Sequence, residues 1–104
     1  MPGHDIVNAQ HDALIDALLS VRTREEGYKF LDDLLTRREF DDLSTRLEVA
    51  RLLKKEVTYS DISKLTGASS ATIGRVNRAL VYGSDGYKLI LERQEAEKKG
   101  NTDD

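Results

Sequence analysis

The chain has 104 residues, a formal net charge of −3, 38% hydrophobic and 34% charged residues, and no cysteine. This composition favours a single soluble domain over a disordered chain, and the small core expected at this length makes pairing with a second copy a route to stability. The lack of cysteine excludes disulfides and thiolate metal sites, and nothing indicates a cofactor. No apolar run approaches the ~20 residues of a membrane span and no secretion signal is present, so we expect a cytoplasmic protein without membrane contact.

Charge is unevenly distributed along the chain. Residues 1–45 carry 5 Lys/Arg against 10 Asp/Glu, residues 46–93 carry 9 against 5, and residues 94–104 carry 2 against 4, which gives net charges of −5, +4 and −2. The local potential, rather than the total charge, steers a polyanion. The basic middle block therefore keeps nucleic acid among the candidate partners.

The spacing of apolar residues predicts three helices in the first half of the chain, at about residues 5–21, 24–35 and 37–55. The second and third begin at Thr-x-x-Glu patterns, which run from Thr23 to Glu26 and from Thr36 to Glu39. In such a capping box the Thr hydroxyl accepts a hydrogen bond from a backbone N–H one turn into the helix, and the acid accepts one from the Thr N–H.

Three shorter helices are predicted in the second half, at about residues 59–66, 70–82 and 87–98. The first follows a third capping pattern at Thr58, has Ile62 and Leu65 as apolar residues, and stops at Gly67, which can adopt a left-handed conformation. We expect no strand. The sequence thus predicts an all-α fold of six helices in a single domain over residues 1–98, with a flexible tail over residues 99–104.

The segment from about residue 58 to residue 82 has the form of a helix-turn-helix. A crossing of two helices through a short turn needs one position free of a Cβ, which Gly67 supplies. Apolar residues on both sides of the turn are expected to hold the two helices at a fixed angle. They are Ile62, Ala68, Ile73 and Val76.

The second helix of this segment begins with small polar residues. Ser69 is its predicted N-cap, and small side chains allow a helix N-terminus to enter the major groove. Arg75 and Arg78 follow one and two turns later, where they can pair with phosphates or guanine. Asp61 is the only carboxylate between residues 57 and 84. This surface predicts binding to double-stranded DNA, and the alternative is a hairpin that serves packing or docks another protein. We do not expect an enzyme, because the sequence contains no recognisable group of nucleophile, acid and base residues that could form a catalytic site.

Three segments between Phe30 and Leu80 resemble the bacterial Trp repressor family. They are Phe30-Leu31-x-x-Leu34-Leu35-Thr36, Leu43-Ser44-Thr45-Arg46-Leu47 and Gly67-Ala68-x-x-Ala71-Thr72-Ile73-x-Arg75. The resemblance implies a six-helix, intertwined homodimer that reads a two-fold symmetric operator. It also implies DNA contacts at Ser70, Ala71 and Thr72, with Tyr59, Ser60 and Ser63 near the DNA backbone. Together with the residues predicted from the helix-turn-helix pattern itself, these form the full predicted DNA-binding set. It consists of Tyr59, Ser60, Ser63, Lys64, Ser69, Ser70, Ala71, Thr72, Arg75 and Arg78.

The tryptophan site of that family is only partly present. The two arginines that flank the ligand in the family match Arg46 and Arg75, and the family's threonine near the ligand amino group matches Thr36. The family's glycine after the second arginine is Val76 here, and the added isopropyl group is expected to fill or close the slot. We therefore predict that L-tryptophan is not the corepressor, which leaves the two arginines for another ligand or for phosphate.

These observations predict a transcriptional regulator, acting as a repressor through occlusion of its operator. The alternative is a helical protein–protein interaction module without DNA binding. Tyr82 and Tyr87 flank the glycine turn at residues 83–86 and are expected at the dimer interface.

Overall fold

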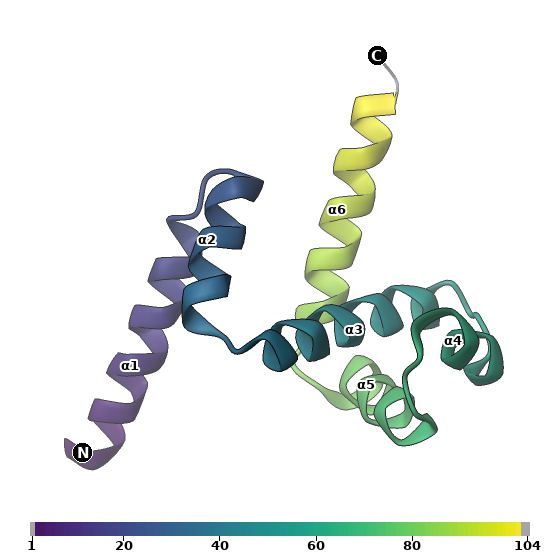
Figure 1. The fold of residues 1–104 in the computed structure, drawn as a ribbon, viewed down its shortest axis with the longest axis horizontal. Helices are drawn as coiled ribbons and strands as arrows, with labels where there is room; N and C mark the ends of the chain where they lie inside the picture. The colour runs from purple at the N-terminus through teal and green to yellow at the C-terminus, as the bar shows by residue number, and fades with distance from the viewer. Residues whose placement is uncertain (1, 103–104) are drawn as a thin grey trace. The chain divides into compact units, whose positions relative to one another are not determined.

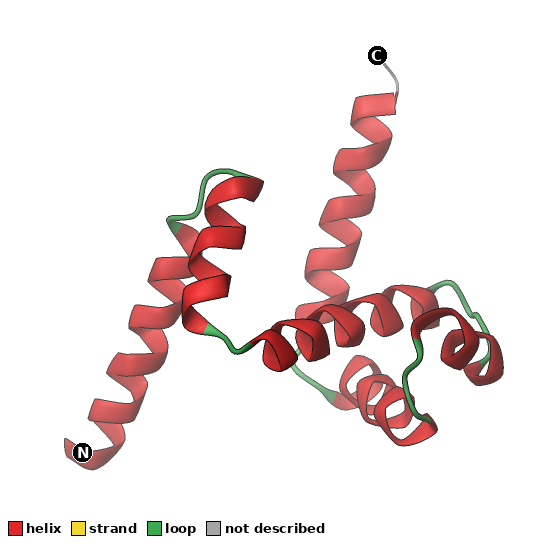
Figure 2. Cartoon of the chain, in the orientation of Figure 1, coloured by secondary structure: helices red, strands yellow, loops and turns green. Residues whose placement is uncertain are grey.

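A computed structural model describes residues 2–102 of the chain, and the side chains of residues 7–100. This described part is helical without strands (Figures 1 and 2), which confirms the all-α class. The helices are α1 (Pro2–Leu19), α2 (Arg24–Leu34), α3 (Arg37–Lys54), α4 (Tyr59–Thr66), α5 (Ser70–Tyr82) and α6 (Gly86–Thr102).

The first and last helices have different ends from those predicted. Helix α1 starts at Pro2, three residues before the predicted start, because proline suits a first turn whose N–H groups need no helical partner. It ends at Leu19, short of the predicted residue 21. Helix α6 runs to Thr102 and takes in residues predicted as a tail. Gly100 costs a helix interior only about 1 kcal/mol, so it does not act as a stop here.

The Thr half of each predicted capping box is confirmed, and the acid half is confirmed at α3. The Thr23, Thr36 and Thr58 hydroxyls accept from backbone N–H groups three residues on, at 3.1, 3.1 and 3.2 Å. At α3 the box is reciprocal, because Glu39 Oε1 accepts from the Thr36 N–H at 2.8 Å. This backbone hydrogen bond is the main reason that the pKa of Glu39 is lowered. At α2 the carboxylate of Glu26 accepts from the Arg22 N–H instead of the expected Thr23 N–H.

The chain divides into two compact units, residues 1–40 and 41–104. In the first unit α1 and α2 run antiparallel as a hairpin (Figure 1), and the rings of Tyr28 and Phe40 lie 6.0 Å apart. None of the described side chains of this unit is buried. Two helices alone supply too little surface to enclose a core.

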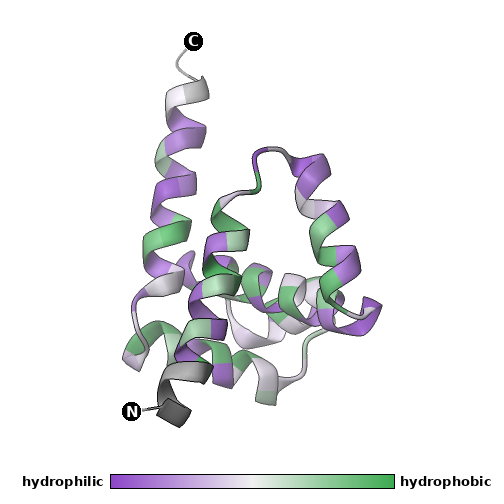
Figure 3. Ribbon diagram, turned by 90° about the vertical axis from the view of Figure 1, so that its left-hand side faces the viewer, coloured by the Kyte–Doolittle hydropathy of each residue, from purple (hydrophilic) through white to green (hydrophobic). Residues whose placement is uncertain are grey.

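The buried residues all belong to the second unit, and they come from α3, α4, α5, α6 and the turn between α4 and α5. They are Val49, Ala50, Leu52, Ile62, Ala68, Ile73, Val76, Leu80 and Leu91. The four residues predicted to hold the helix-turn-helix together are among them. Figure 3 shows the matching alternation of apolar and polar residues along the helices.

Leu65 is a correction to the predicted core. Its side chain is 70% exposed, whereas Ile62 on the same helix is fully buried. On the eight residues of α4 the face turned toward the core is narrow, and Ile62 occupies it.

Gly67 and Gly74 offer a matched pair of stability tests. Gly67 has φ 77°, so Gly67→Ala should lower the free energy of unfolding by about 1–2 kcal/mol. Gly74 lies inside α5, where an added Cβ meets nothing within 4 Å, so Gly74→Ala should raise the free energy of unfolding by about 0.5–1 kcal/mol. Urea denaturation at equal protein concentration measures both. Shifts of the same sign would contradict the left-handed turn.

Candidate nucleic-acid interface

Helices α4 and α5 are joined by a three-residue turn, Gly67-Ala68-Ser69. Gly67 is in the left-handed conformation and its N–H donates to Ser63 O, which closes α4. Ser69 Oγ accepts from the Thr72 N–H at 3.1 Å and thereby starts α5, as predicted. Two local devices thus end one helix and begin the next within three residues.

Two hydroxyls of α4 reach into this turn. Ser63 Oγ donates to Ala68 O at 2.9 Å, and Thr66 Oγ1 accepts from the Ala68 N–H at 3.1 Å. Thr66 Oγ1 also donates to Ile62 O at 2.8 Å. Ser63 was predicted near the DNA backbone, but its hydroxyl here serves the turn. Thr66 was missed, because its bond to the turn follows from the fold rather than from a sequence pattern.

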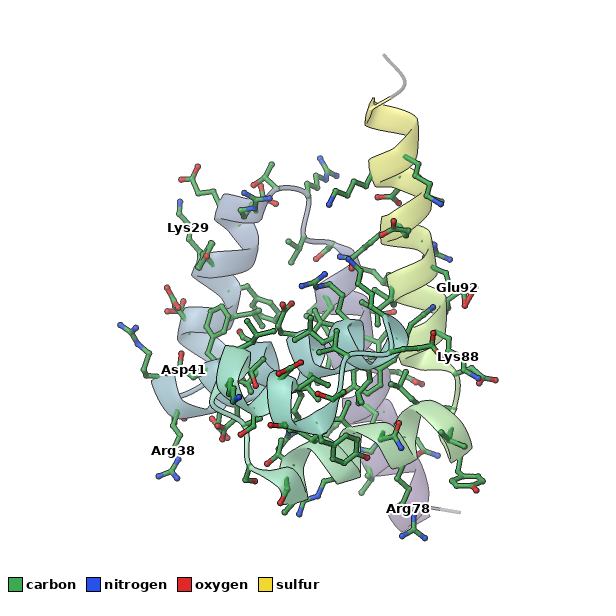
Figure 4. The ribbon with its side chains drawn as sticks, turned by 90° about the vertical axis from the view of Figure 1, so that its right-hand side faces the viewer. Lys29, Arg38, Asp41, Arg78, Lys88 and Glu92 are labelled. Atoms are coloured by element: carbon green, nitrogen blue, oxygen red, sulfur yellow. The ribbon has the colours of Figure 1, made fainter. Side chains whose placement is uncertain are left out.

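Most of the residues predicted to bind DNA lie on the surface. Ser63 and Thr72 are half-buried. The exposed members of the predicted set are Tyr59, Ser60, Lys64, Ser69, Ser70, Ala71, Arg75 and Arg78. The side chain of Arg78 points outward from α5 (Figure 4). Residues from both helices and from the turn are therefore accessible on the same helix-turn-helix.

The cations of the helix-turn-helix lack the carboxylate partners that the cations at the end of α3 have. Among the described side chains, no carboxylate oxygen lies within 4 Å of the charged nitrogens of Lys64, Arg75 or Arg78. By contrast, Arg51 forms two hydrogen bonds to Glu48 and Lys54 pairs with Glu92 of α6 at 3.3 Å.

The pairing at the end of α3 also changes two pKa values. The hydrogen bond from Arg51 lowers the pKa of Glu48, and the same bond raises the pKa of Arg51. Helix α3 therefore ends in compensated charge, whereas the described cations of the helix-turn-helix have no carboxylate partner in the described part of the chain.

A cavity of about 350 Å³ lies between α3, the turn and α5, with Arg46 and Arg75 in its wall. Val76 also lines it and is only 3% exposed, because its side chain belongs to the core. The expectation that Val76 closes this slot is therefore too strong, since space remains beside it. Thr36, predicted near a ligand, belongs to the first unit, whereas the cavity is lined by residues of the second. The lining is mostly polar and consists of Asp42, Thr45, Arg46, Thr66, Gly67, Ala68, Ser69, Thr72, Arg75 and Val76.

In the described part of the chain, no three His, Cys, Asp or Glu side chains gather as metal ligands would. Nor does any described helix combine the length and apolar character needed to cross a bilayer.

Known proteins share both sequence and fold with this chain. A family model described as Trp repressor protein matches residues 9–95. YerC, an uncharacterized protein of Bacillus subtilis (strain 168), is 50% identical over 82 residues, which cover 79% of each chain. A candidate Trp repressor from Staphylococcus aureus, known from a crystal structure, has a TM-score of 0.81 and 48% identity, and the match covers 84% of this chain and 87% of that one. A TrpR like protein from Eubacterium eligens, also known from a crystal structure, has a TM-score of 0.79 and 48% identity, and the match covers 81% of this chain and 87% of that one.

Proposed function

Because the chain belongs to the Trp repressor family, we propose that it is a sequence-specific regulator of transcription that binds double-stranded DNA as a homodimer. It acts in the cytoplasm as a repressor that occludes its operator. The observation that carries this proposal is the exposed, carboxylate-poor face of the helix-turn-helix on a fully buried apolar support.

The reading surface is the N-terminal part of α5. Ser70 and Ala71 are exposed, and the half-buried Thr72 follows one residue later. Small side chains let the helix end approach base edges closely, and the Thr methyl and hydroxyl offer both apolar and hydrogen-bonding contacts. The partial positive charge of the helix N-terminus adds attraction for phosphate.

The remaining contacts go to the DNA backbone. Arg75 and Arg78 carry the charge on α5, and Lys64 carries it on α4. Phosphate contacts of this kind set the position on the duplex and make affinity depend on salt. Arg46, which shares the cavity wall with Arg75, adds a further cation for phosphate or for a ligand. Tyr59, Ser60 and Ser69 complete the surface.

A second copy is proposed because residues 1–40 have no buried side chain among those described. Helix α1 exposes large apolar residues, of which Ile15 is 53% exposed and Leu19 is 76% exposed. In the second unit an apolar groove of about 500 Å³ is lined by Leu47, Ala79, Ser84, Gly86, Tyr87 and Ile90. Coverage of both by a partner would join residues 1–98 into one domain, and two reading heads would require half-sites about 34–36 Å apart.

The cavity near Arg46 and Arg75 is a poor site for an indole. Val76 and Ala68 are the only apolar side chains among its lining residues, whereas small-molecule pockets for aromatic groups are mainly apolar. L-tryptophan therefore has no corepressor role.

Alanine substitution of Thr72 and of Arg75 tests the DNA-binding face. On a duplex that the wild-type protein has enriched from a random-sequence library, Thr72→Ala should weaken binding by about 1–3 kcal/mol, the loss of a base contact. Arg75→Ala should weaken binding to every duplex and reduce the salt slope by about 1, the loss of a phosphate contact. Fluorescence anisotropy across a salt series provides the affinities, which should fall steeply with salt. Arg93→Ala, at an exposed arginine of α6, is the control and should bind like the wild type.

The opposite result identifies the alternative. No retention of any duplex, together with a flat salt response, would favour a protein–protein interaction module. If both variants bound like the wild type, the DNA-binding face would be wrongly assigned.

The homodimer can be tested by light scattering. The wild type should have twice the chain mass of 11.7 kDa, and Ile15→Glu should dissociate the pair by placing a charge on the exposed apolar face of α1. Gln10→Glu adds the same charge to the same helix at an exposed polar position and should leave the mass unchanged. A stable, folded wild-type monomer would refute the paired model.

L-tryptophan should change neither the melting temperature nor the affinity for the enriched duplex. A ligand present at 100 times its Kd stabilises the folded state by about 2.7 kcal/mol, an effect of several degrees in differential scanning fluorimetry. A tryptophan-dependent rise in both quantities would restore the corepressor role.

A further inference from the structure

Ala68 occupies an exceptional place in the helix-turn-helix. It follows the left-handed Gly67 and precedes the N-cap Ser69, so its backbone groups belong to neither helix. The residue is nevertheless 6% exposed and part of the core. A buried N–H or C=O without a partner is costly, so both groups need hydrogen bonds from elsewhere.

Both hydrogen bonds come from hydroxyls of α4. Thr66 Oγ1 accepts from the Ala68 N–H at 3.1 Å, and Ser63 Oγ donates to the Ala68 C=O at 2.9 Å. Thr66 is itself oriented, because its hydroxyl proton goes to Ile62 O at 2.8 Å. The two hydroxyls therefore hold the peptide groups on either side of the Ala68 Cα, one from each side.

We propose that Ser63 and Thr66 are positioning residues that fix the orientation of α5, and that the Ser63 hydroxyl does not bind phosphate. This inference rests on the proposed DNA-binding function. The chain passes directly from Ala68 to Ser69 and then to the first turn of α5, so a shift of the Ala68 peptide moves the residues that read bases. Recognition of a base edge requires placement within about 0.5 Å, which supporting hydrogen bonds provide.

A positioning role and a phosphate contact affect the enriched and the scrambled duplex differently. Loss of a positioning hydrogen bond degrades contacts with base edges while the number of neutralised phosphates stays the same. Affinity for the enriched duplex should then fall, whereas affinity for a scrambled duplex and the slope of log K against log salt should change little. Loss of a hydroxyl that bonds a phosphate lowers both affinities together, because such a contact carries no sequence information.

The experiment compares Ser63→Ala with Ser63→Thr in the full-length protein. Ser63→Ala should weaken binding to the enriched duplex about tenfold, because a turn that shifts to expose the unpaired Ala68 carbonyl populates the reading geometry less often. The scrambled-duplex affinity should stay within about twofold and the salt slope should be unchanged. Ser63→Thr keeps the hydroxyl and should restore most of the loss. Circular dichroism melts confirm that each variant is folded at the assay temperature.

Ser60→Ala is the contrasting variant on the same helix. Its exposed hydroxyl is proposed to face the DNA backbone, so both affinities should fall together. Thr66→Val and Thr66→Ser provide a second pair that decides the question if Ser63→Ala fails to fold. Thr66→Val should behave like Ser63→Ala and should speed amide hydrogen exchange at Ala68, while Thr66→Ser should behave like the wild type.

Three outcomes overturn the inference. Equal losses on both duplexes for Ser63→Ala would make Ser63 a phosphate contact. Unchanged binding by folded Ser63→Ala and Thr66→Val would make the hydroxyls dispensable. A wild-type protein that does not distinguish its enriched duplex from the scrambled one would show that the proposed function, and this inference with it, is wrong.

Discussion

The packing of α4 and α5 against α3 is the interaction on which the rest of the described structure depends. Val49, Ile62 and Ile73 come from these three helices and are fully buried. Burial of an aliphatic side chain of this size contributes about 1.5–3 kcal/mol, more than any single cap or surface ion pair in the chain. Because these side chains turn inward, the opposite faces of α4 and α5, with Ser70 and Arg75, are exposed to solvent.

Local interactions explain why so much of this arrangement could be predicted from the sequence. A capping box is complete within four residues, so Thr36 and Glu39 predict the start of α3 without knowledge of the fold. The left-handed stop at Gly67 and the N-cap at Ser69 are local in the same way. The apolar periodicity then identified Ile62 as part of the core, and the comparisons confirm the fold class and the family resemblance.

The features that the sequence did not reveal depend on how helices meet. Leu65 has the right spacing for a core residue but lies outside the narrow buried face of α4. The hydroxyl of Ser63 could have faced solvent, and only the path of the turn brings it to the Ala68 carbonyl. The space beside Val76 likewise depends on the separation of α3 and α5, which the pattern of residues in the sequence does not specify.

None of the described side chains of the α1–α2 hairpin is buried, which has a consequence for how such a regulator would be controlled in a cell. In the proposed pair, the order of this segment depends on an encounter between two copies, so it follows mass action. Newly made chains at low abundance would spend more time with the hairpin open to proteases, while paired chains would be spared. The rate of degradation per chain would then fall as the concentration of the protein rises. The concentration of paired, active regulator would therefore increase more than in proportion to its rate of synthesis.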